Sequence, residues 1–506
     1  MTRPFYVTTA ISYPNGRPHV GHAYEAIAAD AIARWHRLAG RDVRFLTGTD
    51  EHGLKMAQTA RARGLEPRAL ADEMSGAFKV MADALNISYD RFIRTTDADH
   101  YAASAELWRR MEARGDVYLG RYEGWYSVRD EAFYAEDELL DGEGGRLSPQ
   151  GTPVEWTVEE SWFFRLSAYQ DRLLAHYEAH PGFVRPEARR NEVASFVRSG
   201  LADLSISRTS FDWGVPVPGA PEHVMYVWVD ALTNYLTGAG WPYDEPMAAK
   251  WWPASLHVIG KDIVRFHAVY WPAFLMSAGL PLPKAVFGHG FVLHRGEKMS
   301  KSSGNVADPH ALAERYGVDG LRYFLLREVS FGQDGGYSDE AIVTRVNADL
   351  ANGLGNLAQR CLSMIAKQCG GVVPEPIAEV RKPHFGWDIE GLLQHHLDDL
   401  RLHEALEAIW GLVREANGYF AEMAPWALRK SDPATADAVL YWTAEAVRQL
   451  AILVRWAVPA SADALLDQLG QGADARDFAA LATPLAPGTV LPQPTGVFPR
   501  LEVAAE

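Results

Sequence analysis

The strand–helix–strand pattern at the start of the chain constrains its fold more than any other feature. Residues 5–11, FYVTTAI, are typical of a short buried strand, and after a PNGRP turn apolar side chains recur at helical spacing from Val20 to Leu38. The next apolar run breaks into the polar loop TDEHG at residues 49–53. Two strands joined by a helix pair in parallel with a right-handed crossover. The pattern therefore predicts a parallel α/β sheet, in which ligands bind at the carboxyl ends of the strands.

A second pattern of the same kind lies later in the chain. Residues 255–279 indicate a strand, a glycine and a helix, and residues 284–293 indicate the next strand. The segment between the two patterns is rich in Tyr, Trp and Gly and contains a DGEGG turn, which is typical of an inserted domain. We therefore expect a split parallel sheet, with halves at 1–115 and 222–295 around an insertion at 116–221.

The last part of the chain has a helical pattern. One apolar stripe consists of Val346, Leu350, Leu354, Leu357, Cys361 and Ile365, and similar patterns follow at 389–410 and 434–456. This predicts an antiparallel helix bundle over 346–506, ending in an extended proline-rich tail. Residues 296–345 would connect the sheet to the bundle.

Composition excludes several classes of protein. Of the 506 residues, 48% are hydrophobic, which argues against disorder, and no apolar run is long enough to span a bilayer. The start has no export or transit pattern, and the only two cysteines, Cys361 and Cys369, rule out a disulfide framework, so we expect a cytoplasmic protein. The net charge of −16 means that any nucleic acid must bind at local basic patches.

The HVGH segment places two histidines where the first strand gives way to a helix. His19 and His22 are three residues apart, so both imidazoles lie on one face of the helix start. Free N–H groups and the positive end of the helix dipole favour a phosphate there. Taken alone, the pair is more often structural, and a metal site formed with Asp50 and His52 is a further alternative.

A charged loop, RGEKMSKSSGN, is the second candidate for chemistry. Lys298, Ser300 and Lys301 lie between Gly296 and Gly304, as a lid that closes over pyrophosphate would require. Such a loop is more often only solvated surface. The chain lacks the glycine patterns of P-loop and dinucleotide-binding proteins, so ATP would have to bind in another way.

HVGH and KMSKS on a split parallel sheet resemble the HIGH and KMSKS signatures of class I aminoacyl-tRNA synthetases. The segments AISYPNGRPHVGHAYE, LTGTDEHG, YVWVDALTNY, IGKDIVRFHAVYWPAFLMSAG, GHGFVLHRGEKMSKSSGN and MAPWALRK are similar to the methionyl-tRNA synthetase family, in the order of that family. The resemblance implies a doubly wound, Rossmann-like catalytic domain with a connective insertion, and an all-α anticodon-binding bundle; residues 296–345 would hold the KMSKS loop and a stem-contact region. It implies that the chain activates L-methionine with ATP and Mg²⁺ and transfers it to initiator and elongator tRNA(Met).

The resemblance also implies three groups of site residues. The catalytic residues would be His19, His22, Lys298 and Lys301, and ATP would contact His19, Gly21, His22, Gly260, Asp262, Lys298, Ser300 and Lys301. Methionine would contact Ala10, Ile11, Tyr13, Asp50, Trp228, Ala231, Leu232, Tyr235, Ile263, His267 and Trp271, with Asp50 on the ammonium group and the aromatic rings around the thioether. The anticodon would contact Asn356, Arg360 and Trp426.

Departures from the family pattern carry expectations of their own. Many relatives have a zinc knuckle in the insertion, but no cysteine precedes Cys361, so we expect no structural zinc; GWYSVRDEAFY resembles the same hairpin without its metal. The chain ends at Glu506 without the dimerisation domain of longer members, so we expect a monomer. Candidate tRNA contacts are Arg185, Arg189, Arg190, Arg198 and Arg360.

Three alternatives remain at this level. A sister synthetase for valine, leucine, isoleucine or cysteine would need a larger editing insertion or a zinc-bound pocket. A tRNA-binding scaffold without catalysis is the second. A metal hydrolase built on His19, His22 and His52 is the third.

Overall fold

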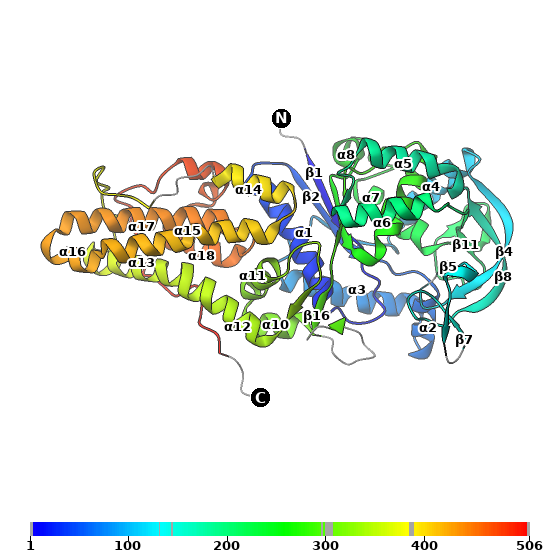
Figure 1. Cartoon of the computed structure of the whole chain (residues 1–506), viewed down its shortest axis with the longest axis horizontal. Coiled ribbons are helices and arrows are strands. Elements are labelled where there is room, and N and C mark those ends of the chain that lie inside the picture. Colours follow the sequence, from blue (N-terminus) through cyan, green and yellow to red (C-terminus); the bar gives the residue numbers. More distant parts are fainter. Residues whose placement is uncertain are drawn as a thin grey trace.

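The computed structural model describes residues 4–130, 132–142, 145–294, 297–298, 307–383 and 389–502. The molecule is elongated, with a helix bundle at one end, an α/β region in the middle and long antiparallel strands at the other end (Figure 1). The predicted order of these three parts agrees with the arrangement in space.

The α/β region is built on a six-stranded, fully parallel sheet, as predicted from the sequence. Its order is β3 (Arg91–Arg94), β2 (Val43–Thr49), β1 (Phe5–Thr9), β14 (Leu256–Gly260), β15 (Val286–His289) and β9 (Val184–Arg185). β1 pairs with β2 on one side and with β14 on the other, so the two sequence halves meet at β1 and β14. This junction is the point where the strand order reverses, and ligands of open α/β sheets bind outside it.

Helices cover both faces of this sheet because its strands carry apolar side chains on both faces. Phe5 and Val7 pack into the same core as α1 (Val20–Leu38) and α3 (Pro67–Ala84). The intervening Tyr6 packs into a second core with α4 (Ala98–Ala113), α7 (Val227–Gly238) and α9 (Trp271–Ala278). Side chains that alternate between two buried faces produce the continuous apolar runs from which the strands were predicted.

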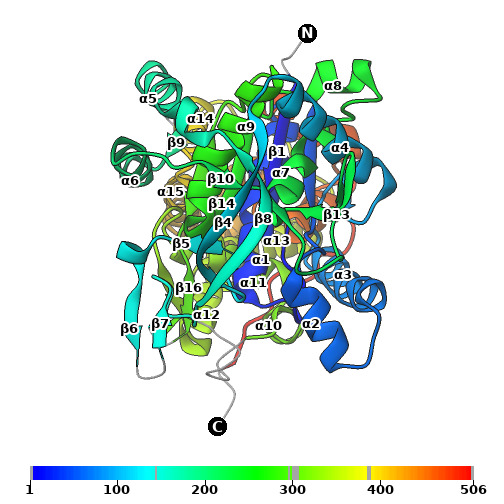
Figure 2. The ribbon, with the colours of Figure 1, turned by 90° about the vertical axis from the view of Figure 1, so that its right-hand side faces the viewer.

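The insertion is dominated by an antiparallel ribbon of β4 (Val117–Ser127) and β8 (Glu155–Phe164), seen in front in Figure 2. The ribbon carries two short edge strands and a small hairpin: β5 (Ala132–Tyr134), β10 (Leu204–Ser205), β6 (Leu140–Gly142) and β7 (Gly145–Leu147). Helices α5 (Gln170–Ala179) and α6 (Glu187–Arg198) follow it. The predicted insertion is not wholly separate from the central sheet, because β9 pairs with β15.

Shorter elements complete the α/β part. They are α2 (Leu54–Ala62), α8 (Glu245–Trp251), the sheet of β11 (Ser207–Arg208), β13 (Ala220–Met225) and β12 (Pro216–Val217), and the sheet of β17 (Glu297–Lys298), β16 (Val292–His294) and β18 (Gly335–Tyr337). The turns η3 (Lys261–Ile263) and η4 (Phe266–Tyr270) connect β14 to α9. η4 is a π-helical turn, a form that is frequent at functional sites.

A run of helices joins the sheet to the bundle. These are α10 (Pro309–Tyr316), α11 (Val318–Glu328), α12 (Asp339–Arg345) and the π-helical segment η6 (Val346–Gly355). Arg322 of α11 is fully buried and donates to Asp30 of α1 at 2.6 Å, and this ion pair links the connecting helices to the helix that covers the sheet. Asp30 has a pKa below its usual value: burial alone would raise it, but Arg322 and Arg34 outweigh that effect.

The bundle contains α13 (Asn356–Gln368), α14 (Ile389–Asp398), α15 (Leu402–Met423), α16 (Pro425–Ser431), α17 (Pro433–Val454) and α18 (Pro459–Gln468). The predicted apolar stripe from Val346 to Ile365 is buried, which confirms this part of the helical prediction. The proline-rich tail runs back along the bundle. The side-chain amide of Asn347 donates to the carbonyl oxygen of Leu501 at 2.8 Å and accepts from the backbone N–H of Leu501 at 2.8 Å. No helix within the described residues is long and apolar enough to cross a membrane.

Candidate active site

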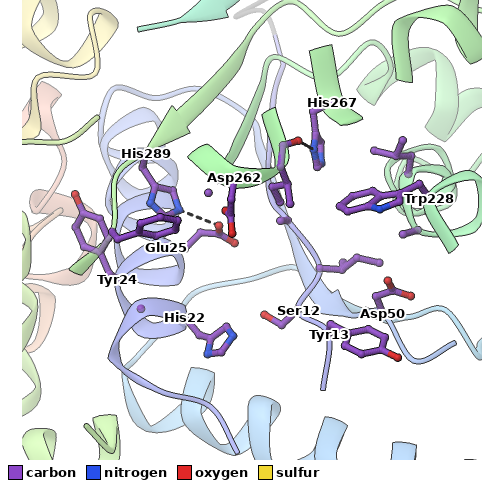
Figure 3. Close-up of a pocket in the computed structure, with 18 of the residues that line it drawn as sticks. Ser12, Tyr13, His22, Tyr24, Glu25, Asp50, Trp228, Asp262, His267 and His289 are labelled. Carbon is purple, nitrogen blue, oxygen red and sulfur yellow. Dashed lines mark hydrogen bonds and ion pairs between the residues drawn. The ribbon is translucent and has the colours of Figure 1, made fainter. Parts of the chain in front are cut away.

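A cavity of about 400 Å³ opens at the carboxyl ends of β1, β2 and β14, at the junction of the two halves of the sheet. It is the location that the strand order favours. Fifteen of the predicted residues line it: Ala10, Ile11, Tyr13, His19, Gly21, His22, Asp50, Trp228, Ala231, Leu232, Tyr235, Gly260, Asp262, Ile263 and His267. Residues separated by more than two hundred positions are thus brought to one site (Figure 3).

Among the described residues, Trp271 is a predicted methionine contact that does not line the cavity. Trp271 is fully buried, and its ring centroid lies 6.1 Å from that of Tyr235, which stands in the wall. A direct contact between Trp271 and an amino acid in this cavity is therefore not seen, and the residue supports the wall from behind. Ser300 and Lys301 lie outside the described residues, and Lys298 is described only through its backbone in β17.

The two histidines of HVGH form the N-terminal cap of α1. His19 is the N-cap, and its Nδ1 accepts a hydrogen bond from the backbone N–H of Gly21 at 3.0 Å. His22 reaches back, and its Nδ1 accepts from the backbone N–H of His19 at 3.1 Å. A neutral imidazole that accepts at Nδ1 carries its proton on Nε2. The cap therefore fixes both rings in the tautomer whose Nε2–H is a donor, which suits a phosphate ligand.

Gly21 is needed for this cap. A Cβ atom on Gly21 would lie 2.8 Å from Cε1 of His19, a distance that real Cβ atoms avoid. The resemblance implied that ATP contacts Gly21. The structure shows that it first leaves room for the His19 ring, which lies with its centroid 3.9 Å from that of His22.

Aromatic side chains form the opposite wall of the cavity. The half-buried Trp228 stacks on Phe266, with ring centroids 3.8 Å apart and planes tilted by 5°. His267 of η4 donates from Nδ1 to the carbonyl oxygen of Ile263 at 2.9 Å, and its Nε2 accepts from the Tyr235 hydroxyl at 2.6 Å. Burial lowers the pKa of His267 to about 4, so the ring is neutral at physiological pH. The wall is therefore uncharged and suits an apolar side chain.

Two predicted residues sit at the ends of β1 and β2. The backbone N–H of Asp50 donates to the carbonyl oxygen of Ser12 at 2.9 Å, and its carboxylate is nearly buried at the cavity. The hydroxyl of Tyr13 accepts from the backbone N–H of Met56 at 3.0 Å. The resemblance implied that Tyr13 contacts methionine; in this structure its hydroxyl points to the start of α2.

Glu25 and His289 form an ion pair in the cavity that the sequence analysis missed (Figure 3). Nε2 of His289 lies 2.9 Å from Oε2 of Glu25, and Nδ1 donates to the carbonyl oxygen of Gly290 at 2.8 Å. Burial would lower the pKa of His289, but the hydrogen bond to Glu25 outweighs it and raises the pKa. Glu25 lies one turn after His22 on α1, and His289 ends β15; these positions are the signals that could have found them.

The metal-hydrolase alternative fails on the geometry of His52. Nδ1 of His52 is 2.6 Å from Asp230, and Nε2 is 2.8 Å from the hydroxyl of Tyr101. Both ring nitrogens are thus engaged in a buried network outside the cavity lining, and His52 cannot join His19 and His22 around a metal ion. Among the described residues, no group of three or more His, Cys, Asp and Glu side chains could hold one.

The bundle brings two of its three predicted residues into contact. The guanidinium of Arg360 on α13 lies 5.0 Å from the Trp426 ring centroid and 4.9 Å from that of Phe420. Trp426 of α16 is 43% exposed, which is high for a tryptophan beside a packed bundle. Asn356 is exposed one turn before Arg360 on the same helix. The three form a surface site of an amide, a guanidinium and an indole.

The four predicted basic contacts near the insertion are partly engaged with the protein itself. Arg185 donates to the carbonyl oxygen of Asp398 at 2.7 Å. On α6, Arg189 pairs with Glu192 and Arg190 with Glu187, while Arg198 ends the helix exposed. They remain predicted contacts.

Comparison with known proteins agrees with this geometry. The family model for class I tRNA synthetases (M) matches residues 5–362, and the model for the anticodon binding domain of methionyl tRNA ligase matches residues 390–505. The methionine–tRNA ligase of Mycobacterium bovis is 62% identical over 511 residues, covering 99% of this chain and 98% of its own. The Brucella suis enzyme is 62% identical over 508 residues, covering 99% of each.

Solved structures show the same similarity. Mycobacterium tuberculosis methionyl-tRNA synthetase in complex with methionyl-adenylate is 61% identical and superposes with a TM-score of 0.94 over 99% of this chain and 100% of that one. The free-state structure of the same protein has a TM-score of 0.89 and 58% identity over 99% of both chains. Sequence, fold and site agree over nearly the whole length, and the chain belongs to the methionyl-tRNA synthetase family of class I aminoacyl-tRNA synthetases.

Proposed function

We propose that this chain is a methionine–tRNA ligase, which activates L-methionine with ATP and transfers it to the 3′ end of tRNA(Met). The observation that carries the proposal is one cavity with a phosphate-suited helix start on one side and a neutral aromatic wall on the other. The match to methionine–tRNA ligases over 99% of the chain supports it.

In the first step, a methionine carboxylate oxygen attacks the α-phosphorus of ATP and pyrophosphate leaves, giving methionyl-adenylate. The carboxylate is already ionised, so the chain needs no general base and acts by positioning and charge. Asp50 would hold the ammonium group, and Trp228 and His267 would surround the thioether, which packs well against rings. A neutral His267 adds no charge beside the sulfur atom.

The phosphates of ATP would lie at the start of α1. The Nε2–H groups of His19 and His22, oriented by the cap, would donate to phosphate oxygens as negative charge shifts to the leaving pyrophosphate. Gly260 and Asp262 would contact the ribose, and Lys298, Ser300 and Lys301 would close over the phosphates. ATP enters as its magnesium complex, and Mg²⁺ shares the phosphate charge.

In the second step, a ribose hydroxyl of the terminal tRNA nucleotide attacks the adenylate carbonyl and AMP leaves. We propose that Asn356, Arg360 and Trp426 hold the anticodon of both initiator and elongator tRNA(Met), with the indole stacked on an unpaired base. For the division of the chain we propose the bounds predicted from the sequence: catalytic halves at 1–115 and 222–295, a connective insertion at 116–221, the KMSKS loop and stem-contact region at 296–345, and the anticodon-binding bundle at 346–506.

Setting and assembly are parts of the same proposal. We expect a cytoplasmic enzyme, because both cysteines are free thiols rather than a disulfide. We also expect a monomer. Light scattering of the purified chain tests the second expectation, and a dimer mass would contradict it.

Amino-acid-dependent exchange of labelled pyrophosphate into ATP, run with each of the twenty amino acids, tests the activation step. We expect methionine to give the fastest exchange. Exchange led by valine, leucine, isoleucine or cysteine would favour a sister synthetase. Exchange with no amino acid would favour a tRNA-binding scaffold.

Trp426→Ala tests the anticodon site. Loss of base stacking, worth about 1–3 kcal/mol, should raise the KM for tRNA in charging by about tenfold or more and leave pyrophosphate exchange unchanged. Trp442→Ala is the matched control, because Trp442 is a partly exposed tryptophan on α17 of the same bundle. Equal loss of exchange and charging in the Trp426 variant would count against an anticodon role.

A further inference from the structure

The turn between β4 and β5 carries the insertion to the cavity. Arg129 and Asp130, in this turn, line the cavity together with the histidines of α1. Neither residue was singled out from the sequence, because a charged pair in a hairpin turn is usually solvated surface. Through these two residues the insertion forms part of the cavity that His19 and His22 line.

Asp130 is the centre of a buried hydrogen-bonded group that we call the hydroxyl cluster: Ser127, Asp130, Ser148 and Thr152. Oδ2 of Asp130 accepts from Ser148 at 2.6 Å and from Thr152 at 2.5 Å, and the two hydroxyls lie 2.8 Å apart. Ser127 and Thr152 hydroxyls lie 2.6 Å apart, and the backbone N–H of Asp130 donates to Ser127 at 3.2 Å. The three hydroxyl residues are buried. The Tyr134 hydroxyl adds a bond to the same carboxylate oxygen at 3.1 Å.

The hydroxyl cluster occupies the hairpin that resembles the zinc knuckle of other family members. Zinc is bound in proteins by several thiolate, imidazole or carboxylate ligands, and among these four residues Asp130 alone offers such a group, so the cluster does not fit zinc. Hydroxyl groups that donate to one carboxylate form a closed hydrogen-bonded unit instead. The cluster therefore joins the β4–β5 turn to the 148–152 turn without a metal, and it fixes the backbone on which Arg129 stands.

The charges of the cavity indicate what Arg129 does there. Within the described lining, Arg129 is the single arginine or lysine, whereas Glu25, Asp50, Asp130 and Asp262 are carboxylic acids. A nucleotide triphosphate or a tRNA backbone would bring further negative charge into this acidic surrounding. Guanidinium groups bind phosphate with paired donors, and Arg129 is exposed at the rim, where it can turn to a ligand.

We propose that Arg129 binds a phosphate group of a substrate and that the hydroxyl cluster is the positioning device that holds it over the cavity. The inference rests on the proposed function. The phosphate belongs either to ATP or to the 3′-terminal nucleotides of tRNA, and the two sources are separable because they enter in different steps.

Arg129→Ala, measured in both steps, tests the proposal. If Arg129 binds ATP, the variant should show a KM for ATP in methionine-dependent pyrophosphate exchange that is raised by about tenfold or more. If it binds tRNA, exchange should be unchanged, and transfer of methionine from preformed adenylate to tRNA should slow by about tenfold or more. Arg129→Lys should recover part of either loss, because it restores the charge without the paired donors.

Arg121→Ala is the matched control. Arg121 is exposed on β4 of the same ribbon and does not line the cavity. An equal loss in this control would overturn the proposal, because the effect would then come from net charge alone. Rates and KM values of Arg129→Ala within about twofold of wild type in both steps would also overturn it. A wild-type chain without methionine-dependent exchange would overturn the proposed function as well, whereas an active wild type with an unaffected variant would overturn only this inference.

Thr152→Val tests the positioning role, because it removes one hydroxyl donor and keeps the shape. The variant should reproduce the step-specific defect of Arg129→Ala, and the double variant should be no worse than Arg129→Ala alone. Defects that multiply in the double variant would show that the cluster acts independently of Arg129 and would overturn the positioning part. Melting temperatures of all variants show whether a general loss of folding contributes.

Discussion

Asp230→Asn tests whether Asp230 holds the residues that would bind methionine in place. Asp230 lies on α7, and its two carboxylate oxygens are 2.6 Å from Nδ1 of His52 and 2.6 Å from Nε2 of His100. His52 is two residues from Asp50, while α7 also carries Trp228. The buried carboxylate thus ties the loop that would hold the ammonium group to the helix that would line the thioether pocket.

The strength of this tie follows from the pKa of Asp230. Burial alone would raise the pKa, but the close contacts of the carboxylate with His52 and His100 outweigh it and lower the pKa from 3.8 to about 2. A shift of this size corresponds to roughly 2 kcal/mol for a fully buried group. Because the folded pKa is below the unfolded one, this stabilisation is present above about pH 4 and is lost as the pH falls through about 2.

At neutral pH, Asp230→Asn should therefore lower the free energy of unfolding by about 2–3 kcal/mol and loosen the loop of Asp50. We expect the KM for methionine in pyrophosphate exchange to rise by about tenfold, since small misplacements of positioning groups are costly. The KM for ATP should change by less than about twofold, because the cap at His19 and His22 is intact.

Glu445→Gln provides the control for this experiment. Glu445 is a buried carboxylate of α17 that accepts two hydrogen bonds of 2.7 Å from Arg448, inside the bundle. It should lower the melting temperature without changing the KM for methionine. If Asp230→Asn destabilises the chain but leaves the KM for methionine unchanged, or if Glu445→Gln raises that KM equally, the positioning argument is refuted.

Three further predictions concern the cavity and the sheet. The KM for methionine should be flat from about pH 6 to 8, since the pKa of His267 is about 4 and the ring titrates only below that range; a KM step near pH 6.5 that disappears in His267→Gln would contradict this. Gly21→Ala should lower kcat in exchange by about tenfold or more with an unchanged KM for methionine, because the new Cβ would displace the His19 ring; wild-type kcat would refute the cap argument. Gly48→Ala should abolish stable folding, because its Cβ would overlap the backbone of β3, whereas Gly76→Ala, which has nothing within 4 Å, should melt as wild type.

Much of the site was predictable because it follows from strand order. Apolar runs with helices between them fix a parallel sheet, and its carboxyl edge gathers the ends of β1, β2 and β14 whatever the side chains are. Asp50 follows the end of β2 and lies at the cavity for this reason, and Asp262, which the family resemblance implied, lies there too. Trp271 could not be placed correctly, because a helix pattern does not show which side of a wall a buried aromatic residue occupies. It supports Tyr235 from behind.

Glu25 and Arg129 were missed for different physical reasons. Glu25 is half-buried, and the pairing of such a carboxylate can be foreseen only together with its partner, His289, which lies 264 residues away in the chain. The position of Arg129 at the cavity depends on how the β4–β5 turn is held. The hydrogen bonds of the hydroxyl cluster hold it, and they join residues that are distant in sequence. Local spacing places Glu25 one turn after His22, but it does not reveal the pairing of Glu25 with His289 or the position of Arg129 at the cavity.

The histidine cap shows how a motif can hold two roles at once. N-cap residues are usually Ser, Thr, Asp or Asn, and a capping box usually returns a Glu or Gln at its third helical position. Here His19 and His22 take both positions and give only their Nδ1 atoms to the helix. A serine and a glutamate would cap the helix equally well but would present no N–H donor to a phosphate. The hydrogen bonds that cap the helix therefore also orient the imidazoles of His19 and His22 toward a phosphate, and the cap needs no second group of residues to hold these rings in place.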